Sequence, residues 1–170
     1  GYIWLGSTNT GLLRYDGDRF EAFDIGPASA SGPRTVPDID AMLLSEDELW
    51  LGTWGMGLNR LTISNGSIQH YSTGTDSALA LQSNFIQSLY KDSQKRLWIG
   101  SRDGLQRLDP DGRLHSIGGM EQELPLVSQR VWAFSQSPDG RVWIATSQGL
   151  HWYSDSAGLS AAVQIPELMA

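Results

Sequence analysis

The stretch RLWIGSRDGLQRLDPDGR, residues 96–113, contains the pattern that decides the fold of this chain. An apolar segment at 97–99 ends in Gly100, and a Gly104-Leu105 pair then leads to an Asp111-Gly112 turn. Asp followed by Gly readily adopts the positive φ values of a tight hairpin turn. The stretch therefore predicts two short antiparallel strands and a turn into a third.

The same compound pattern occurs four times in 170 residues. Its tryptophans are 46, 48 and 45 residues apart, and a Gly-Leu pair follows each tryptophan by six or seven residues. Self-similarity at this period is typical of propeller blades. The four copies are marked by Trp4, Trp50, Trp98 and Trp143 and by the pairs Gly11-Leu12, Gly57-Leu58, Gly104-Leu105 and Gly149-Leu150.

Strand and turn signals fill the rest of each copy. Alternating apolar runs at 39–44, 85–90 and 131–135 precede a polar turn and the tryptophan strand, which is a hairpin signal. Later Asp-Gly or Asn-Gly turns lead to further strands at 20–23, 67–71 and 113–117, and a last strand is expected at 161–165, before Pro166. We expect an all-β fold: a β-propeller fragment of about four blades in one partial domain, each blade a four-stranded antiparallel sheet, the first without its innermost strand. The approximate blades are 1–32, 33–78, 79–125 and 126–170.

The tryptophan strands are apolar at consecutive positions, as expected when both faces of a sheet are covered by neighbouring blades. Because side chains alternate along a strand, Trp98 and Gly100 should face one neighbour, and Leu97 and Ile99 the other. Gly100 then leaves room for a bulky side chain of the adjacent blade. The expected repeat core is Trp4, Trp50, Trp98 and Trp143 with Gly6, Gly52 and Gly100.

Composition excludes several functional classes. The 12 Lys and Arg residues against 19 Asp and Glu give a formal charge of −7, which disfavours nucleic acid and anionic membrane surfaces as partners. The chain has no cysteine, which excludes thiol catalysis and cysteine zinc sites. Because no apolar run approaches the roughly 18 residues of a membrane helix, we expect no membrane contact by this segment.

Segments 1–24, 49–72 and 81–117 resemble the two-component regulator propeller repeat. The resemblance implies the periplasmic sensor domain of a bacterial inner-membrane receptor whose output domain is a histidine kinase or a diguanylate cyclase. The string YDGDRF at 15–20 resembles the first repeats of such sensors, which implies a piece near the N-terminus of its parent. Either the remaining blades of that propeller or a second copy would cover the end blades, and two copies could close an eight-bladed ring as a homodimer.

A ligand is expected on the loops that follow the tryptophan strands and on those that join one blade to the next, since loops carry specificity on a rigid scaffold. Trp54 falls on such a loop, where an indole suits stacking on a sugar or another apolar ring; the alternative is that it fills space beside the flanking glycines. Arginines there could receive anionic or hydroxyl-rich groups, or could pair with nearby acids instead. The candidate ligand-binding residues are Trp54, Arg34, Arg102, Asn84, Arg130, Asn9 and Gln148.

No catalytic set emerges from the repeats. The three histidines, at positions 70, 115 and 151, lack the spacing of a metal site, and residues 109–112 lack the distal Glu of a calcium loop. We expect neither a metal nor a cofactor. The sequence favours a non-catalytic module that senses a small molecule, an oligosaccharide being one candidate; the alternatives are an interaction or self-assembling scaffold and, less favoured, a propeller lyase or glycosidase.

Overall fold

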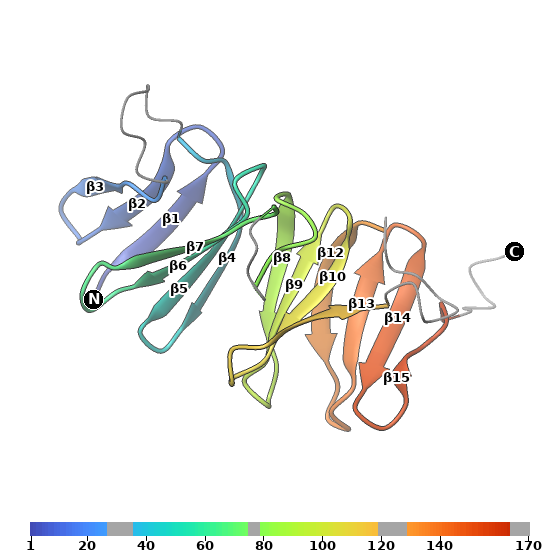
Figure 1. Ribbon diagram of the computed structural model, residues 1–170. Helices are drawn as coiled ribbons and strands as arrows, with labels where there is room; N and C mark the ends of the chain where they lie inside the picture. Colours follow the sequence, from blue (N-terminus) through green and yellow to red (C-terminus); the bar gives the residue numbers. More distant parts are fainter. Residues whose placement is uncertain (27–35, 75–78, 119–128, 164–170) are drawn as a thin grey trace, which may run out of the picture.

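Residues 1–26, 36–74, 79–118 and 129–163 are described by the computed structural model, and they form four antiparallel sheets in succession along the chain (Figure 1). The first sheet has three strands, and each of the other three has four. Strands adjacent in sequence are adjacent in each sheet, which is the up-and-down order of a propeller blade. The predicted propeller fragment, with a first blade that lacks its innermost strand, is confirmed. None of the described residues forms a helix that could span a membrane.

We call the sheets blades 1 to 4. Their strands are β1 (Ile3–Ser7), β2 (Gly11–Tyr15) and β3 (Phe20–Phe23); β4 (Ile39–Ser45), β5 (Glu48–Thr53), β6 (Leu58–Thr62) and β7 (Ile68–Tyr71); β8 (Ile86–Lys91), β9 (Leu97–Ser101), β10 (Gly104–Leu108) and β11 (Leu114–Ile117); β12 (Val131–Gln136), β13 (Val142–Thr146), β14 (Gly149–Ser154) and β15 (Gly158–Leu159).

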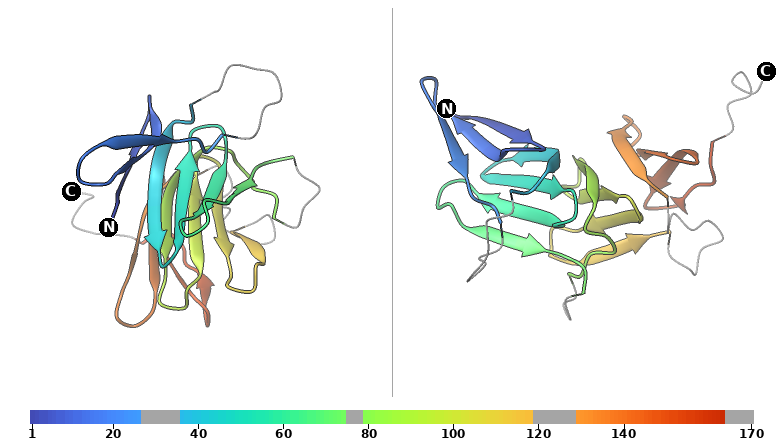
Figure 2. Two further views of the ribbon diagram at one scale, coloured as in Figure 1. Left: turned by 90° about the vertical axis from the view of Figure 1, so that its left-hand side faces the viewer. Right: turned by 90° about the horizontal axis from the view of Figure 1, so that it is seen from above.

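The blades stack one after another, as two further views show (Figure 2). Their innermost strands are neighbours: β4 contacts β8, and β8 contacts β12. One apolar cluster fills each of the three junctions between blades. Because both faces of blades 2 and 3 are covered, the tryptophan strands β5 and β9 are almost wholly buried.

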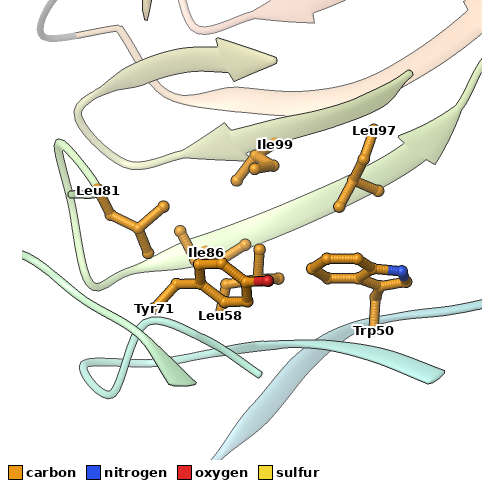
Figure 3. Packing of buried hydrophobic residues seen from close by; sticks show 7 residues of the cluster. All are labelled: Trp50, Leu58, Tyr71, Leu81, Ile86, Leu97 and Ile99. Atoms are coloured by element: carbon orange, nitrogen blue, oxygen red, sulfur yellow. The ribbon is translucent and has the colours of Figure 1, made fainter. Parts of the chain in front are cut away.

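Trp4, Trp50 and Trp98 lie between neighbouring sheets, as predicted, whereas Trp143 is in none of the three clusters between the described blades. Trp50 belongs to the cluster of the junction between blades 2 and 3, where it faces Leu97 (Figure 3). Trp98 is fully buried against blade 4, and Trp4 and Trp143 are partly buried. A Cβ added at Gly6, Gly52 or Gly100 would overlap a residue of the following blade, so the predicted close approach at these glycines is confirmed.

The prediction of a last strand at 161–165 is corrected by the structure. The fourth strand of blade 4 is Gly158–Leu159, and residues 161–163 are not in a strand; 164 and 165 lie outside the described residues. A turn after Ser154, in which its Oγ accepts a hydrogen bond from the amide of Ala157 at 3.2 Å, reverses the chain earlier than expected. The pairing of β14 therefore begins at Gly158.

Candidate ligand-binding site

The loops at one end of blades 2 and 3 are joined by backbone hydrogen bonds. The carbonyl of Asn84 accepts from the amides of Gly55 and Gly57, each at 2.9 Å. Its side chain binds Thr73, with Oδ1 accepting from the backbone amide at 2.9 Å and Nδ2 donating to Oγ1 at 3.0 Å. Gly57 has φ of +77°, and a Cβ there would lie 2.2 Å from the carbonyl oxygen of Tyr71. Asn84, predicted as a ligand contact, thus connects two blades.

Trp54 lies on this joined loop frame. Its backbone amide donates to the carbonyl of Asp38 at 2.9 Å, and its ring meets Phe85 edge to face at 5.1 Å between centroids. The side chain is still 39% exposed, so contact with Phe85 fills only part of its surface. An indole held in this way presents apolar area on a fixed support.

The two described arginines among the candidates lie beside aromatic rings. The guanidinium carbon of Arg102 is 5.8 Å from the centroid of Phe85, and that of Arg130 is 5.7 Å from the centroid of Trp132. Neither guanidinium forms an ion pair within the part of the chain that the structure describes. Their donors are therefore not bound to a described acid.

Each innermost strand carries a β-bulge at the same place. The pairing of β4 with β5, β8 with β9 and β12 with β13 skips one residue, and the skipped residues are Asp40, Gln87 and Trp132. Bulges re-aim side chains and are frequent beside functional sites. Trp132 is 49% exposed, whereas the Oε1 atom of Gln87 is buried without a hydrogen-bond partner among the described residues. Burial, and secondarily the charge of Asp38, raises the pKa of the Asp40 carboxyl.

Sequence reasoning missed these bulge residues, because Trp132 reads as one more apolar residue in an alternating run. Alignment of the repeats could have singled it out: the flanking residues stay alike, while the bulge position changes from Asp to Gln to Trp. We call Trp54, Phe85, Arg102, Arg130 and Trp132 the rim cluster. It consists of two contact groups, Trp54 with Phe85 and Arg102, and Arg130 with Trp132, carried by three consecutive blades.

The other predicted contacts are less tied to this cluster. The backbone amide of Asn9 donates to Ser7 Oγ in the exposed turn after β1. Gln148 accepts at Oε1 from Gln129 Nε2 at 3.3 Å, beside the end of β13. Arg34 lies outside the described residues.

The histidines have ordinary partners. Nδ1 of His70 lies 2.5 Å from Asn59 Oδ1, Nε2 of His115 lies 3.1 Å from Asp109 Oδ2, and Nδ1 of His151 lies 3.1 Å from the carbonyl of Ser160. Within the described ranges no three His, Asp or Glu side chains gather as a metal-ligand group.

Stacked antiparallel blades with a shared loop rim define the chain as a segment of a β-propeller. Two segments of the chain, residues 80–103 and 125–148, match the model of the Two component regulator propeller family. Each matched segment includes an innermost strand and the tryptophan strand after it.

Known proteins with similar sequences or structures include signalling proteins and lyases. The chain is 28% identical over 110 residues to Histidine kinase P4 of Formosa agariphila, covering 61% of this chain and 8% of that protein. The extracellular domain of the hybrid two component system BT3049 from B. thetaiotaomicron superimposes with a TM-score of 0.76 and 22% identity, over 96% of this chain and 23% of that one. The structure of streptogramin B lyase superimposes with a TM-score of 0.64 and 12% sequence identity, over 98% of this chain and 52% of the lyase. The chain thus spans a small part of these signalling proteins.

Proposed function

We propose that this chain is a non-catalytic, ligand-sensing propeller segment, and that the ligand binds at the rim cluster. The observation that carries the proposal is the combination of two exposed indoles, Trp54 and Trp132, with two arginines that have no described acid partner. Hydrogen bonds between loops hold the first indole and Arg102 in place. Such preorganisation lowers the entropic cost of binding.

The chemistry of the rim cluster supports a hydroxyl-rich ligand such as an oligosaccharide. An indole offers a broad apolar face for the C–H groups of a sugar ring, and the forked donors of arginine suit hydroxyl or carboxylate oxygens. The acceptor at Gln87 Oε1, which has no partner among the described residues, would bind a ligand hydroxyl once the neighbouring side chains adjust.

The receptor context is part of the same proposal. The family match and the similarity to Histidine kinase P4 support a periplasmic sensor domain in an inner-membrane protein with a kinase or diguanylate cyclase output. The structural similarity to streptogramin B lyase concerns the fold, and a shared fold does not transfer a reaction.

Assembly through the blade ends is a second candidate function, supported by one observation. Ile3 and Leu5 on β1 are 58% and 41% exposed, whereas Leu49 and Leu51, at the same positions of β5, are buried against blade 1. In a complete propeller, further blades would cover this face. For the 170-residue chain by itself we propose that a second copy covers it as a homodimer, which light scattering over a concentration series tests.

The test of the sensing role is a calorimetric and thermal-shift screen of the chain against oligosaccharides and small organic acids. A ligand of the native state raises the melting temperature. We expect Trp54→Ala and Arg102→Ala each to weaken the strongest hit about tenfold or more. The matched controls are Phe20→Ala and Arg113→Ala, whose exposed side chains lie outside the rim cluster and should leave affinity unchanged.

Three results would overturn the sensing proposal. Turnover of a bound compound would indicate an enzyme instead. Equal loss of affinity in the rim and control variants would remove the rim cluster as the site. No response to any compound, together with concentration-dependent association, would favour the scaffold.

A further inference from the structure

A recess of about 150 Å³ lies between blades 2 and 3, and it is lined by none of the rim cluster. Its apolar walls include Trp50, Leu97 and Leu108, and the first two face each other across the junction (Figure 3). Arg60, Lys91 and Lys95 add three cationic groups to the lining. The recess therefore combines an apolar interior with positive charge, in a chain whose formal charge is −7.

The neighbouring junction, between blades 3 and 4, shows why this recess stays open. Tyr153 of β14 packs edge to face on Trp98 at 5.1 Å, and its hydroxyl accepts from Arg107 Nη1 at 3.0 Å. The strand register puts Leu108 of β10 at the position equivalent to Tyr153, because the two residues pair with Leu97 and Val142. Leucine lacks both the ring and the hydroxyl. Tyr71 packs on Trp50 with 5.8 Å between the ring centroids, but the recess beside them stays open.

The equivalent arginine is correspondingly less well satisfied. Arg60 pairs with Trp50 in the same register in which Arg107 pairs with Trp98. Arg60 Nη1 donates to Glu48 at 3.2 Å, but its Nε is buried with no hydrogen-bond partner among the described residues. A buried donor without a partner carries a desolvation penalty.

Charge is also balanced differently at the two junctions. Next to Trp98, the buried guanidinium of Arg96 is bound by two carboxylates, those of Asp92 and Asp155. At the recess, Lys91 Nζ donates to a hydroxyl, Ser45 Oγ, at 2.9 Å, and Lys95 Nζ lies 3.4 Å from a largely exposed carboxylate.

The acid that also lines the recess does not offset these lysines. Asp109 is bound by Arg107 at 2.6 Å, and His115 lies 3.1 Å away. The lysine ammonium groups therefore have room for a stronger anionic partner.

We propose that this recess binds a small carboxylate carried on a planar apolar body. The carboxylate lies toward Lys91 and Lys95, and the body packs between Trp50, Leu97 and Leu108. A cavity of roughly 150 Å³ in another protein accommodates benzene, so an aromatic monocarboxylate is of suitable size. The site is separate from the rim cluster and does not depend on the proposed sensing of a sugar.

Calorimetric titration of the chain with benzoate at low salt tests the proposal, with benzamide as the uncharged analogue. We expect saturable binding of benzoate and about tenfold or more weaker binding of benzamide, since hydrogen bonds between ions are roughly twice as strong as neutral ones. Lys91→Gln introduces the residue that blade 4 has at this position, Gln136, and should weaken benzoate about tenfold. Arg141→Gln, outside the recess, is the matched control.

Leu108→Tyr imitates the filled junction and should abolish binding while the melting temperature stays the same or rises. If that variant does not fold, the affinity of Lys91→Gln for benzoate still tests the proposal. No saturable heat at millimolar benzoate, equal affinity for benzamide, or affinity unchanged in Lys91→Gln would each overturn the proposal.

Discussion

Ile86 of blade 3 occupies the space that Gly52 leaves open in blade 2, so that a Cβ at residue 52 would lie 2.7 Å from Cγ2 of Ile86. Ile86 is 1% exposed, and the added carbon would also lie 3.2 Å from Cβ of Ala41. The same contact recurs at the next junction, where Val131 meets Gly100. The first residue of each innermost strand therefore packs against a glycine in the tryptophan strand of the preceding blade.

Gly52→Ala should destabilise the chain by about 1–3 kcal/mol, because overpacking a filled junction forces the two sheets apart. Urea denaturation measures the loss. Combined with Ile86→Ala, which removes the overlapping methyl group, the loss should be smaller than the sum of the single effects. Strict additivity would contradict the contact.

Asp92→Ala should be among the most damaging substitutions, costing about 3–5 kcal/mol. The buried carboxylate of Asp92 accepts from Arg96 Nε at 2.6 Å and from Trp98 Nε1 at 2.8 Å, so its removal leaves a buried cation short of a partner. Glu48→Ala is the control, since Glu48 makes the similar bond to Trp50 Nε1 but is one-third exposed. Equal losses of unfolding free energy would show that burial does not set the cost.

Acid should weaken the chain partly through Asp155. A hydrogen bond from Gln94, and then those from Arg96, hold the pKa of this carboxyl below its ordinary value of 3.8. A lowered folded-state pKa contributes stability that is present above the unfolded-state value and is lost as the pH falls through the folded-state value. Asp155→Asn should therefore reduce unfolding free energy at neutral pH and flatten its decline below about pH 4.

Urea titrations at neutral and acid pH provide this comparison, with Asp111→Asn, another exposed acid of a turn, as the control. If the unfolding free energy falls as steeply with acid in Asp155→Asn as in the unchanged chain, Asp155 is not a source of the acid sensitivity.

Asn84→Ala should reduce stability rather than ligand affinity. It removes both side-chain bonds to Thr73 and leaves that backbone amide without its acceptor, which costs about 1–3 kcal/mol. The affinity of a rim ligand, measured well below the melting temperature, should change far less than in Trp54→Ala. A large loss of affinity at unchanged stability would instead support the prediction that Asn84 contacts the ligand.

Two members of the rim cluster, Trp54 and Arg102, could be placed on loops from the sequence, because each lies between the tryptophan strand and the Gly-Leu pair of its repeat. The bulge residues were not accessible, since a bulge depends on how two strands pair: Trp132 alternates in sequence as if the ladder were regular, yet the register skips it. The recess between blades 2 and 3 could not be predicted from the sequence either. It arises because Leu108 replaces a tyrosine, and the effect depends on the sheet that faces it.

The sequence by itself determined the repeat unit, the order of its strands and the sharing of one face by each tryptophan and the glycine or alanine two residues later, because alternation and turn chemistry act over a few residues. The tertiary structure alone decided which side chains meet between blades. Arg102 lies near Phe85 and Arg130 near Trp132, and within the described ranges neither pairs with an acid and Arg60 Nε has no hydrogen-bond partner. These outcomes depend on how neighbouring sheets pack, and local propensity carries no information about that.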